Sequence, residues 1–495
     1  MKASTSCWSN FGSRREIGNG VSNESKILLA YPSCFRYSEQ VDSLDIKTSL
    51  LWLASYLKQF HPVEYVDYEL KIGRPASQTQ IRRFERIVRN DLSSRDFDIL
   101  GISCWTSLSY QSSLAVARIC RELYPDKLIV VGGYHPTALP NEFITEDKLF
   151  DYVVCGEGEH ALVDIARRLA DTGRPAKTEI IQGPPLKLEE FVPYNWDLVE
   201  PIVRQHAVNG VDCLYIFLAR GCPFRCSFCM EPLKDANWRA LSPAEAVAQI
   251  MAAARRFEIR SVGIADACFG VRPAWRHEFL NRMVEEQPPF WVIFETRPEY
   301  ITEEDIRLLT HLKAEVQFGV ESGSPSMLRL MHKSRAPEKF LGAFVRASRE
   351  LSSHGIVHRG NLLFNHPGET RDTLDETFAF IDSCLAPEHS SLMWVPHTYM
   401  HFPGCEVYDH RESFENKYGT RFDAGDWWLG DSDQYQASMA LVPSASLDGE
   451  NRELCWRMME PRMEKMKQIL TPQAFRFAAN KYYPYWQDDY RYQNV

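Results

Sequence analysis

Three cysteines in the segment ARGCPFRCSFCME have a spacing that could bind a metal cluster. Cys222, Cys226 and Cys229 form the pattern C-x3-C-x2-C and come directly after the strand-like run LYIFLA. A tight loop can direct three thiolates at three corners of a four-iron cluster, and the missing fourth ligand leaves one iron open to a substrate or cofactor. Structural zinc and buried inert cysteines are the competing interpretations, but structural zinc normally takes four ligands. The pattern therefore favours an iron-sulfur cluster.

Polar side chains follow several of the strand-like runs after the cysteines, in GIADACFGVRPAW, FETRPEYITEEDIRLL, FGVESGSPSMLRLM and NLLFNHPGET. Barrel strands deliver functional side chains from their carboxyl ends into one shared mouth, so these residues are expected to lie together there. The alternative is that they cap strands and pair with one another. The candidates are Asp266, Glu295, Arg297, Glu321 and Ser322.

The chain that must position these residues alternates short apolar runs with helical patterns from Lys26 onward. Such alternation is typical of βα units on a parallel sheet. A Pro-containing connector separates a first series from a second series of six units, which predicts a partial barrel that is open where eight units would close it. The predicted strands are 27–32, 98–103, 128–133 and 152–157, then 214–219, 261–265, 291–295, 315–320, 356–364 and 392–398.

The predicted fold class is α/β: a Rossmann-like parallel sheet, a partial (β/α)6 TIM-type barrel, and a mostly helical C-terminal extension with an amphipathic helix near 450–470. The extension is expected to cover the substrate. The predicted boundaries are a mobile tail over 1–25, the Rossmann-like domain over 26–182, a linker over 183–207, the barrel over 208–415 and the extension over 416–495.

Composition limits the function classes. The 495 residues include 44% hydrophobic and 25% charged residues, as in an ordinary globular protein, and the formal charge of -10 gives no reason to bind nucleic acid. No apolar run is long enough to span a membrane, and the start lacks a secretory signal. The 13 cysteines are an odd number, which favours free thiols or metal ligands. We therefore expect a cytoplasmic protein.

The cysteine spacing, with Phe228 before the third cysteine, resembles that of radical S-adenosylmethionine (SAM) enzymes, and the resemblance runs through most of the second domain. It implies a 4Fe-4S cluster whose open iron chelates SAM, and an electron from the cluster that cleaves SAM to a 5′-deoxyadenosyl radical. It also implies SAM contacts: Glu321 and Ser322 to the ribose or carboxylate, Arg297 to the methionyl carboxylate, Phe228 beside adenine, and Asp266 and Glu295 facing the cofactor.

The first domain resembles the cobalamin-binding domain that precedes the cluster domain in one branch of this superfamily. The resemblance rests on GISCWTSLSY, VVGGYHPTALP and DYVVCGEGE. Gly132 and Gly133 would let backbone approach a bulky ligand, and the small Ser103 and Thr106 would leave room for a nucleotide tail. No D-x-H-x-x-G sequence is present, so a histidine ligand to cobalt is not expected. The alternative is a domain that keeps the fold and has lost the cofactor.

His397, Tyr399 and His401 alternate along VPHTYMHF, so an extended segment would project them to one face, which would be the barrel mouth. The alternative is that they are hydrogen-bonded residues at a strand end. Glu295, His397 and His401 are the candidate proton acceptors. The aromatic C-terminal segment KYYPYWQDDYRYQNV could wall a substrate cavity, although packing over a barrel end is the commoner use of such residues.

The first hypothesis for function is a cobalamin-dependent radical SAM C-methyltransferase that acts on a small molecule, such as a natural product. The alternative is a cobalamin-independent radical SAM dehydratase, rearrangement or redox enzyme with a vestigial first domain. A non-catalytic binding protein is disfavoured because all three cluster cysteines are present. An electron donor, either flavodoxin, ferredoxin or a reductase, is the expected protein partner.

Overall fold

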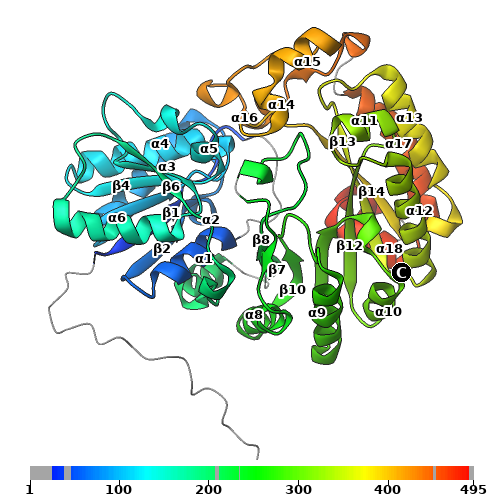
Figure 1. The fold of residues 1–495 in the computed structure, drawn as a ribbon, viewed down its shortest axis with the longest axis horizontal. Coiled ribbons are helices and arrows are strands. Elements are labelled where there is room, and N and C mark those ends of the chain that lie inside the picture. The colour runs from blue at the N-terminus through cyan, green and yellow to red at the C-terminus, as the bar shows by residue number, and fades with distance from the viewer. Residues whose placement is uncertain (1–24, 38–45, 207–210, 234, 450–452, 490–495) are drawn as a thin grey trace, which may run out of the picture.

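Two parallel sheets of six strands each form the two halves of the molecule, the first on the left of Figure 1 and the second on the right. The predicted tail lies outside the described residues except for Ser25. The computed structural model describes residues 25–37, 46–206, 211–233, 235–449 and 453–489.

The first sheet has the strand order β2-β1-β3-β4-β5-β6, and every pairing in it is parallel. Helices cover both faces, so its inner strands are almost wholly buried and apolar. Its strands are β1 (Ile27–Tyr31), β2 (Val63–Asp67), β3 (Ile99–Ser103), β4 (Leu128–Gly132), β5 (Tyr152–Gly156) and β6 (Glu179–Gly183). Its helices are α1 (Thr48–Leu57), α2 (Tyr68–Ile72), α3 (Gln78–Ser93), α4 (Tyr110–Leu123), α5 (Tyr134–Ala138) and α6 (Glu159–Thr172).

The second sheet has the order β14-β13-β12-β11-β10-β7, also all parallel, with its strands in chain order. This is the predicted partial barrel. Its strands are β7 (Val211–Ile216), β10 (Ile259–Ile264), β11 (Trp291–Thr296), β12 (Ala314–Glu321), β13 (Val357–Phe364) and β14 (Leu392–Thr398). Its helices are α8 (Pro243–Arg256), α9 (Pro273–Glu286), α10 (Glu303–Leu309), α11 (Pro325–Leu330), α12 (Pro337–Ser353) and α13 (Arg371–Ser383).

The first barrel strand ends earlier than predicted. Strand β7 stops at Ile216, because the amides of Leu218 and Ala219 bond to the carboxylate of Asp266 and not to a neighbouring strand. The chain then forms a short antiparallel ribbon of β8 (Ala219–Arg220) and β9 (Arg239–Ala240). The cysteine motif follows β8 directly, so this ribbon sets where the motif begins.

The predicted linker packs between the two sheets and is not a loose tether. Tyr194 and Trp196 are buried in a core that is continuous across both domains. The Tyr194 hydroxyl donates to the carbonyl of Phe217 at 3.0 Å, and the Asn195 amide donates to the Ser55 hydroxyl at 2.8 Å. The connector ends in helix α7 (Glu200–His206) and holds the first barrel strand against the first domain.

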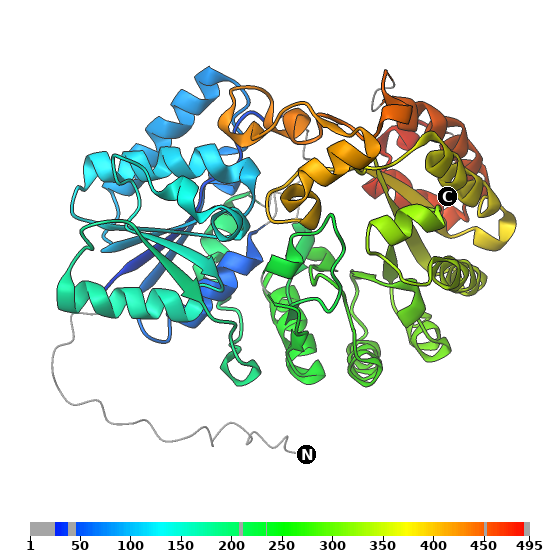
Figure 2. The ribbon, with the colours of Figure 1, turned by 45° about the horizontal axis from the view of Figure 1, so that its top comes forward.

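Residues 402–446, which we call the bridge, run from the barrel mouth to the first domain (Figure 2, orange). Trp428 lies in the core of the first domain, and its indole Nε1 donates to Glu142 at 2.9 Å. At the other end, the Gly368 amide donates to the Pro443 carbonyl at 2.7 Å. The bridge contains α14 (Glu406–Asp409), α15 (Arg411–Tyr418), α16 (Gln434–Ser438), and the paired strands β15 (Arg421–Phe422) and β16 (Leu441–Val442).

The rest of the C-terminal extension begins near the carboxyl end of β13, where the Cys455 thiol donates to Asn365 at 3.9 Å, and runs to the opposite end of the barrel. Helices α17 (Glu453–Ile469) and α18 (Pro472–Lys481) pack on the barrel, and Tyr482 donates to Glu315 at 2.6 Å. Because Glu315 is the second residue of β12, this contact is at the amino ends of the strands. The described part of the aromatic C-terminal segment therefore packs at the bottom of the barrel, and covering of the substrate by the extension stays a prediction. No helix of the described residues has the length and apolar character needed to cross a membrane.

A buried ion pair holds the loops after β10 and β11. Arg276 and Asp305, both essentially unexposed, form a two-bond pair, and Arg276 also donates to the carbonyls of Gly270 and Tyr300. We expect Asp305→Ala to lower the free energy of unfolding by about 3–5 kcal/mol, because it leaves a buried unpaired guanidinium. Chemical denaturation measures this. Glu278→Ala, in the exposed pair with Arg282, is the control, with an expected loss of less than about 1 kcal/mol. Equal losses would contradict the prediction.

Candidate functional site

The three cysteines lie on one loop, residues 222–229, which we call the cluster loop. It begins after Gly221, whose backbone has φ +80°. A Cβ at this position would lie 2.2 Å from the carbonyl oxygen of Asn237, so only glycine allows the ribbon to turn into the loop. Within the loop, the Cys229 amide donates to the Cys226 carbonyl at 3.1 Å. The loop conformation is therefore set by the chain around it.

Ser227 fixes the cluster loop at the mouth of the barrel. Its amide donates to the Met331 carbonyl at 2.9 Å, and its carbonyl accepts from the Val407 amide at 3.1 Å. Its hydroxyl lies 3.3 Å from Nε2 of His366. These partners follow β12, β14 and β13, so the loop is held at the carboxyl ends of the strands, where the sequence predicts the site.

The electrostatics of the three thiols suit a cationic centre. Burial raises the pKa of Cys222, Cys226 and Cys229, and their mutual repulsion as thiolates raises the pKa of Cys222 and Cys229 further. Lys333 and Arg297 act in the opposite direction on Cys226. Among the described residues, no three His, Cys, Asp or Glu side chains are grouped closely enough to hold a single metal ion. The three cysteines therefore suit a cluster in which each thiolate binds a different iron.

Glu321 ends β12 in a strained backbone conformation. Its φ is +68°, a region that costs energy for any residue except glycine, and the register of the sheet shifts beside it. Its carboxylate accepts from Nζ of Lys333 at 2.9 Å, and both side chains are about nine-tenths buried. A Cβ at Gly319 would lie 2.5 Å from Oε1 of Glu321 and 2.6 Å from Nζ of Lys333. A glycine in the strand therefore makes room for this ion pair.

Lys333 was not predicted from the sequence. It lies just beyond the segment FGVESGSPSMLRLM, and no spacing marks it out. Although burial alone lowers the pKa of Lys333, the Glu321 carboxylate raises it overall above its usual value. A fixed positive charge therefore lies beside Cys226.

Glu295 points into the mouth beside this ion pair. Its Oε2 accepts from Nδ2 of Asn361 at 3.2 Å, and burial together with the Glu321 carboxylate raises its pKa. The Oδ1 atom of Asn361 is buried and has no hydrogen-bond partner among the described residues. The pair thus offers acceptor atoms to a ligand that donates hydrogen bonds.

Arg297 reaches the same region but is already bonded. Its Nε donates to Glu299 at 2.8 Å, its Nη2 donates to the carbonyl of Lys333 at 2.8 Å, and its guanidinium lies 4.0 Å from the ring centroid of Phe224. These contacts hold the guanidinium near Cys226. Its role as a partner of the methionyl carboxylate stays a prediction.

Asp266 caps the barrel strand where β7 ends. Its Oδ1 accepts from the amides of Leu218 and Ala219 at 2.8 and 2.9 Å, while its buried Oδ2 has no partner among the described residues. Burial raises the pKa of Asp266 to about 7. Oδ1 of Asp266 thus caps the strand, as the alternative interpretation predicts, and Oδ2 is available to a ligand.

Ser322 and Phe228 face protein neighbours. The Ser322 hydroxyl hydrogen-bonds with Thr377 at 2.8 Å and accepts from the Ser324 amide at 3.0 Å. The Phe228 ring lies edge-on to His366 with centroids 6.3 Å apart. Their predicted contacts with SAM are not tested by these positions.

The side chains of 397, 399 and 401 do not share one face. His397 is exposed, whereas Tyr399 and His401 are buried and hydrogen-bonded to each other at 3.2 Å. The pattern fails because β14 ends at Thr398, after which the His401 amide pairs with the Ser438 carbonyl of the bridge. Burial lowers the pKa of His401 to about 3, so it is neutral at physiological pH.

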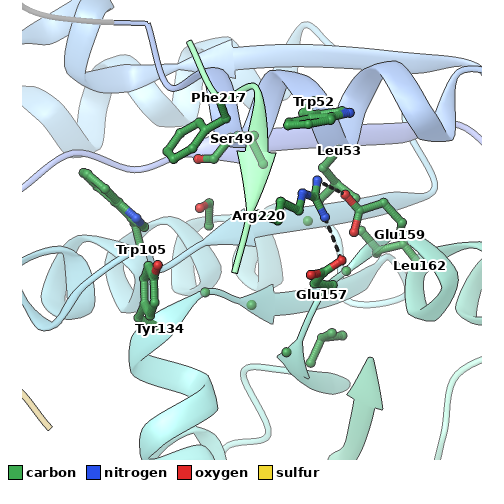
Figure 3. Close-up of a pocket in the computed structure, with 18 of the residues that line it drawn as sticks. Ser49, Trp52, Leu53, Trp105, Tyr134, Glu157, Glu159, Leu162, Phe217 and Arg220 are labelled. Carbon is green, nitrogen blue, oxygen red and sulfur yellow. Dashed lines mark hydrogen bonds and ion pairs between the residues drawn. The ribbon is translucent and has the colours of Figure 1, made fainter. Parts of the chain in front are cut away.

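A second site lies between the two domains. A cavity of about 270 Å³ opens at the carboxyl ends of the first sheet and is closed on its other side by residues after β7 and β10 (Figure 3). Parallel α/β sheets bind ligands at this edge. Its lining includes Leu29, Ser49, Trp52, Gly101, Ser103, Trp105, Gly132, Gly133, Tyr134, Gly156, Glu157, Glu159, Phe217, Arg220, Gly221, Glu231 and Ala265.

Three of the four residues predicted to contact cobalamin line this cavity, namely Ser103, Gly132 and Gly133, while Thr106 does not. The backbone requires glycine at position 133, whereas at position 132 glycine keeps the cavity open. Gly133 has φ +128°, and a Cβ there would lie 2.2 Å from the carbonyl oxygen of Cys104, so the backbone itself requires it. A Cβ at Gly132 would make only ordinary contacts, the shortest at 3.5 Å, and larger side chains there would enter the cavity.

The lining of this cavity suits contact with one face of a large ring system that is held without an imidazole. The described residues that line the cavity include aromatic rings and several glycines but no histidine. Glycines at strand ends allow close approach of backbone to a ring system. Cobalamin bound here would be held by Trp52, Trp105, Tyr134 and the glycine-lined strand ends.

The charged residues of the cavity were not predicted from the sequence. Arg220 donates to Glu157 at 2.9 Å and to Glu159 at 2.5 Å, and its guanidinium lies 4.7 Å from the ring centroid of Trp52 (Figure 3). Glu157 and Glu159 belong to the segment DYVVCGEGE, and Arg220 directly precedes the cysteine motif. Their pairing joins segments 61 and 63 residues apart, which no local pattern indicates.

Comparisons with known families agree with the two sites. Residues 216–381 match the family model described as Radical SAM superfamily, and residues 46–166 match the one described as B12 binding domain. The chain therefore contains a radical SAM domain that is preceded by a B12-binding domain. The cofactors of these domains are a 4Fe-4S cluster with SAM, and cobalamin.

Individual relatives are distant. An uncharacterised methyltransferase from Pyrococcus horikoshii is 24% identical over 347 residues, which are 67% of this chain and 72% of that protein. The anaerobic magnesium-protoporphyrin IX monomethyl ester cyclase of Rubrivivax gelatinosus is 24% identical over 356 residues, 66% of this chain and 60% of the enzyme. The methyltransferase TsrM from Kitasatospora setae, solved with cobalamin and a [4Fe-4S] cluster, has the same overall fold, with a TM-score of 0.62 at 16% identity over 92% of this chain and 90% of its own.

We expect Cys226→Ala to lose the cluster and its cleavage of SAM, because two thiolates cannot securely hold a cluster that needs three. Iron and sulfide content and 5′-deoxyadenosine formation after anaerobic reconstitution measure this. Cys384→Ala is the control, since Cys384 is a buried thiol away from the loop. Near-normal iron in Cys226→Ala would remove the basis of the cluster assignment.

We expect Gly132→Val to exclude cobalamin while the cluster still assembles, because the added side chain enters the cavity and its Cβ makes only an ordinary contact, 3.5 Å from the carbonyl oxygen of Val154. Corrinoid absorption and iron content of the same sample measure the two effects. Gly342→Val, on the outer helix α12, is the control for glycine replacement. Full corrinoid binding by Gly132→Val would place the ligand elsewhere.

Proposed function

We propose that this protein is a cobalamin-dependent radical SAM methyltransferase that places a methyl group on a carbon atom of a small molecule. The observation that carries the proposal is the shared wall between the two sites. Arg220 and Gly221 line the cavity and directly precede Cys222, and Glu231, which also lines the cavity, donates its amide to the sulfur of Cys229 at 3.4 Å. A ligand in the cavity thus lies against the loop that would hold the cluster.

The residues on one side of that wall would bind the cluster and SAM, and those on the other side would bind cobalamin. When bound, the cluster and SAM supply a carbon radical, and cobalamin supplies a methyl group. Lys333 and Arg297 hold positive charge beside Cys226, and Glu295 with Asn361 offers acceptors to a ligand in the mouth. Trp52 and Tyr134 are buried in the cavity wall, whereas Trp105 is exposed there and would be covered by a bound corrinoid.

A second candidate function is a cobalamin-independent radical dehydratase, rearrangement or redox enzyme. One observation favours it: the pKa of Glu295 is raised by burial and by the Glu321 carboxylate, which suits a proton acceptor in the mouth. Such an enzyme would turn over its substrate with the cavity empty.

The expected partners follow from the same chemistry. The cluster needs an electron donor, and we propose flavodoxin, ferredoxin or a reductase in the cytoplasm. No disulfide joins cysteines in the part of the chain that the structure describes, which agrees with a reducing compartment.

We expect the anaerobically reconstituted protein to bind hydroxocobalamin and, with a reductant and SAM labelled in its methyl group, to move the label onto the protein-bound corrinoid. Mass spectrometry of the extracted corrinoid measures the transfer. Gly132→Val is the matched variant, with little bound corrinoid and no label in it. A wild-type protein that binds no cobalamin and still cleaves SAM would replace this proposal by the second candidate.

A further inference from the structure

The cluster loop is tied to the first domain at both of its ends. On the amino-terminal side, Arg220 pairs with Glu157 and Glu159. On the carboxyl-terminal side, the hydroxyl of Tyr134 donates to the carboxylate of Glu231. Both ties lie in the cavity wall, so a ligand in the cavity touches the residues that hold the loop.

The tie at Arg220 is buried and reinforced. The side chains of Arg220, Glu157 and Glu159 are 17%, 8% and 3% exposed. Arg239, the partner of Arg220 in the β8–β9 ribbon, also donates to Glu157. Two guanidinium groups from the radical SAM domain therefore meet one carboxylate of the B12-binding domain. Separating them would leave buried charges unpaired, so the ion pairs favour one position of the ribbon.

The tie at Tyr134 explains the turn made by Gly133. With φ +128°, Gly133 turns the chain sharply after β4, and the Tyr134 amide donates to the carbonyl of Trp105 at 3.1 Å. The tyrosine is 7% exposed and reaches the other domain. Its partner Glu231 donates its own amide to the sulfur of Cys229 at 3.4 Å. A chain of two hydrogen bonds therefore links the cavity wall to a cluster ligand.

We propose that Tyr134 and Arg220 are positioning residues through which occupancy of the cavity by a corrinoid rigidifies the cluster loop. The proposal rests on the proposed function, because it takes cobalamin as the occupant. The barrel side of the loop is already fixed through Ser227, so the ties to the first domain are the contacts that a ligand can strengthen. A ligand that orders the cavity wall also lowers the conformational entropy of the cluster loop. The two sites are then coupled without a change of fold.

The test measures how fast an iron chelator, bathophenanthroline, removes iron from the reconstituted full-length protein with and without bound hydroxocobalamin. We expect cobalamin to slow iron release from the wild type by about fivefold. In Tyr134→Phe, which keeps the ring and removes only the hydroxyl, the slowing should fall below about twofold. Tyr124→Phe is the matched control, because Tyr124 donates to the Leu92 carbonyl in the same domain and does not line the cavity.

Glu157→Gln, at the other end of the loop, should also lose the slowing of iron release. This variant serves as the test if Tyr134→Phe does not assemble a cluster. The proposal is overturned if cobalamin leaves the wild-type rate unchanged, or if Tyr134→Phe binds cobalamin and keeps the full slowing. Label transfer to the corrinoid without slowing would reject this proposal alone. Slowing without label transfer would reject the proposed function alone, and a wild type that binds no cobalamin rejects both.

Discussion

The ion pairs of Arg220 with Glu157 and Glu159 fix one domain against the other at the residue where the cluster loop begins. A buried salt bridge adds little net stability, because desolvation offsets most of the attraction, but here its directed hydrogen bonds favour one relative position of the two domains. Here that geometry sets both the wall of the cavity and the start of the loop. The two cofactor sites therefore cannot be adjusted independently.

The barrel mouth contains a second energetically unfavourable feature, a strained backbone residue beside a buried cation. Glu321 is strained at φ +68°, and its partner Lys333 is a buried cation. Strain and buried charge of this kind persist only where the surrounding structure imposes them, and they concentrate at functional sites. Gly319 is the local accommodation, since any side chain there would displace the pair. The positive charge beside Cys226 thus depends on the end of β12 and on the segment that follows α11.

Packing around these sites differs from what the chain order suggests. The connector that reads as a linker buries Tyr194 and Trp196 in a core shared by both domains. The C-terminal extension divides in two: the bridge lies over the mouth, and α18 with Tyr482 closes the opposite end of the barrel. Both outcomes follow from aromatic residues that need burial, which a sequence pattern can count but cannot assign to a partner.

The sequence by itself determined the two series of parallel strands, the cluster cysteines and the glycine-rich strand ends of the first domain, because these depend on local periodicity and short spacing. The edge strands β2 and β6 of the first sheet were not predicted. The bounds of the other strands agree within a few residues, and β7 ends early because a distant carboxylate, Asp266, takes the amides that would extend it. Only the tertiary structure brought Lys333 to Glu321, Tyr134 to Glu231 and Arg220 to Glu157. Those pairings join residues up to 97 positions apart, and side-chain burial and charge compensation between separate strand ends decide them.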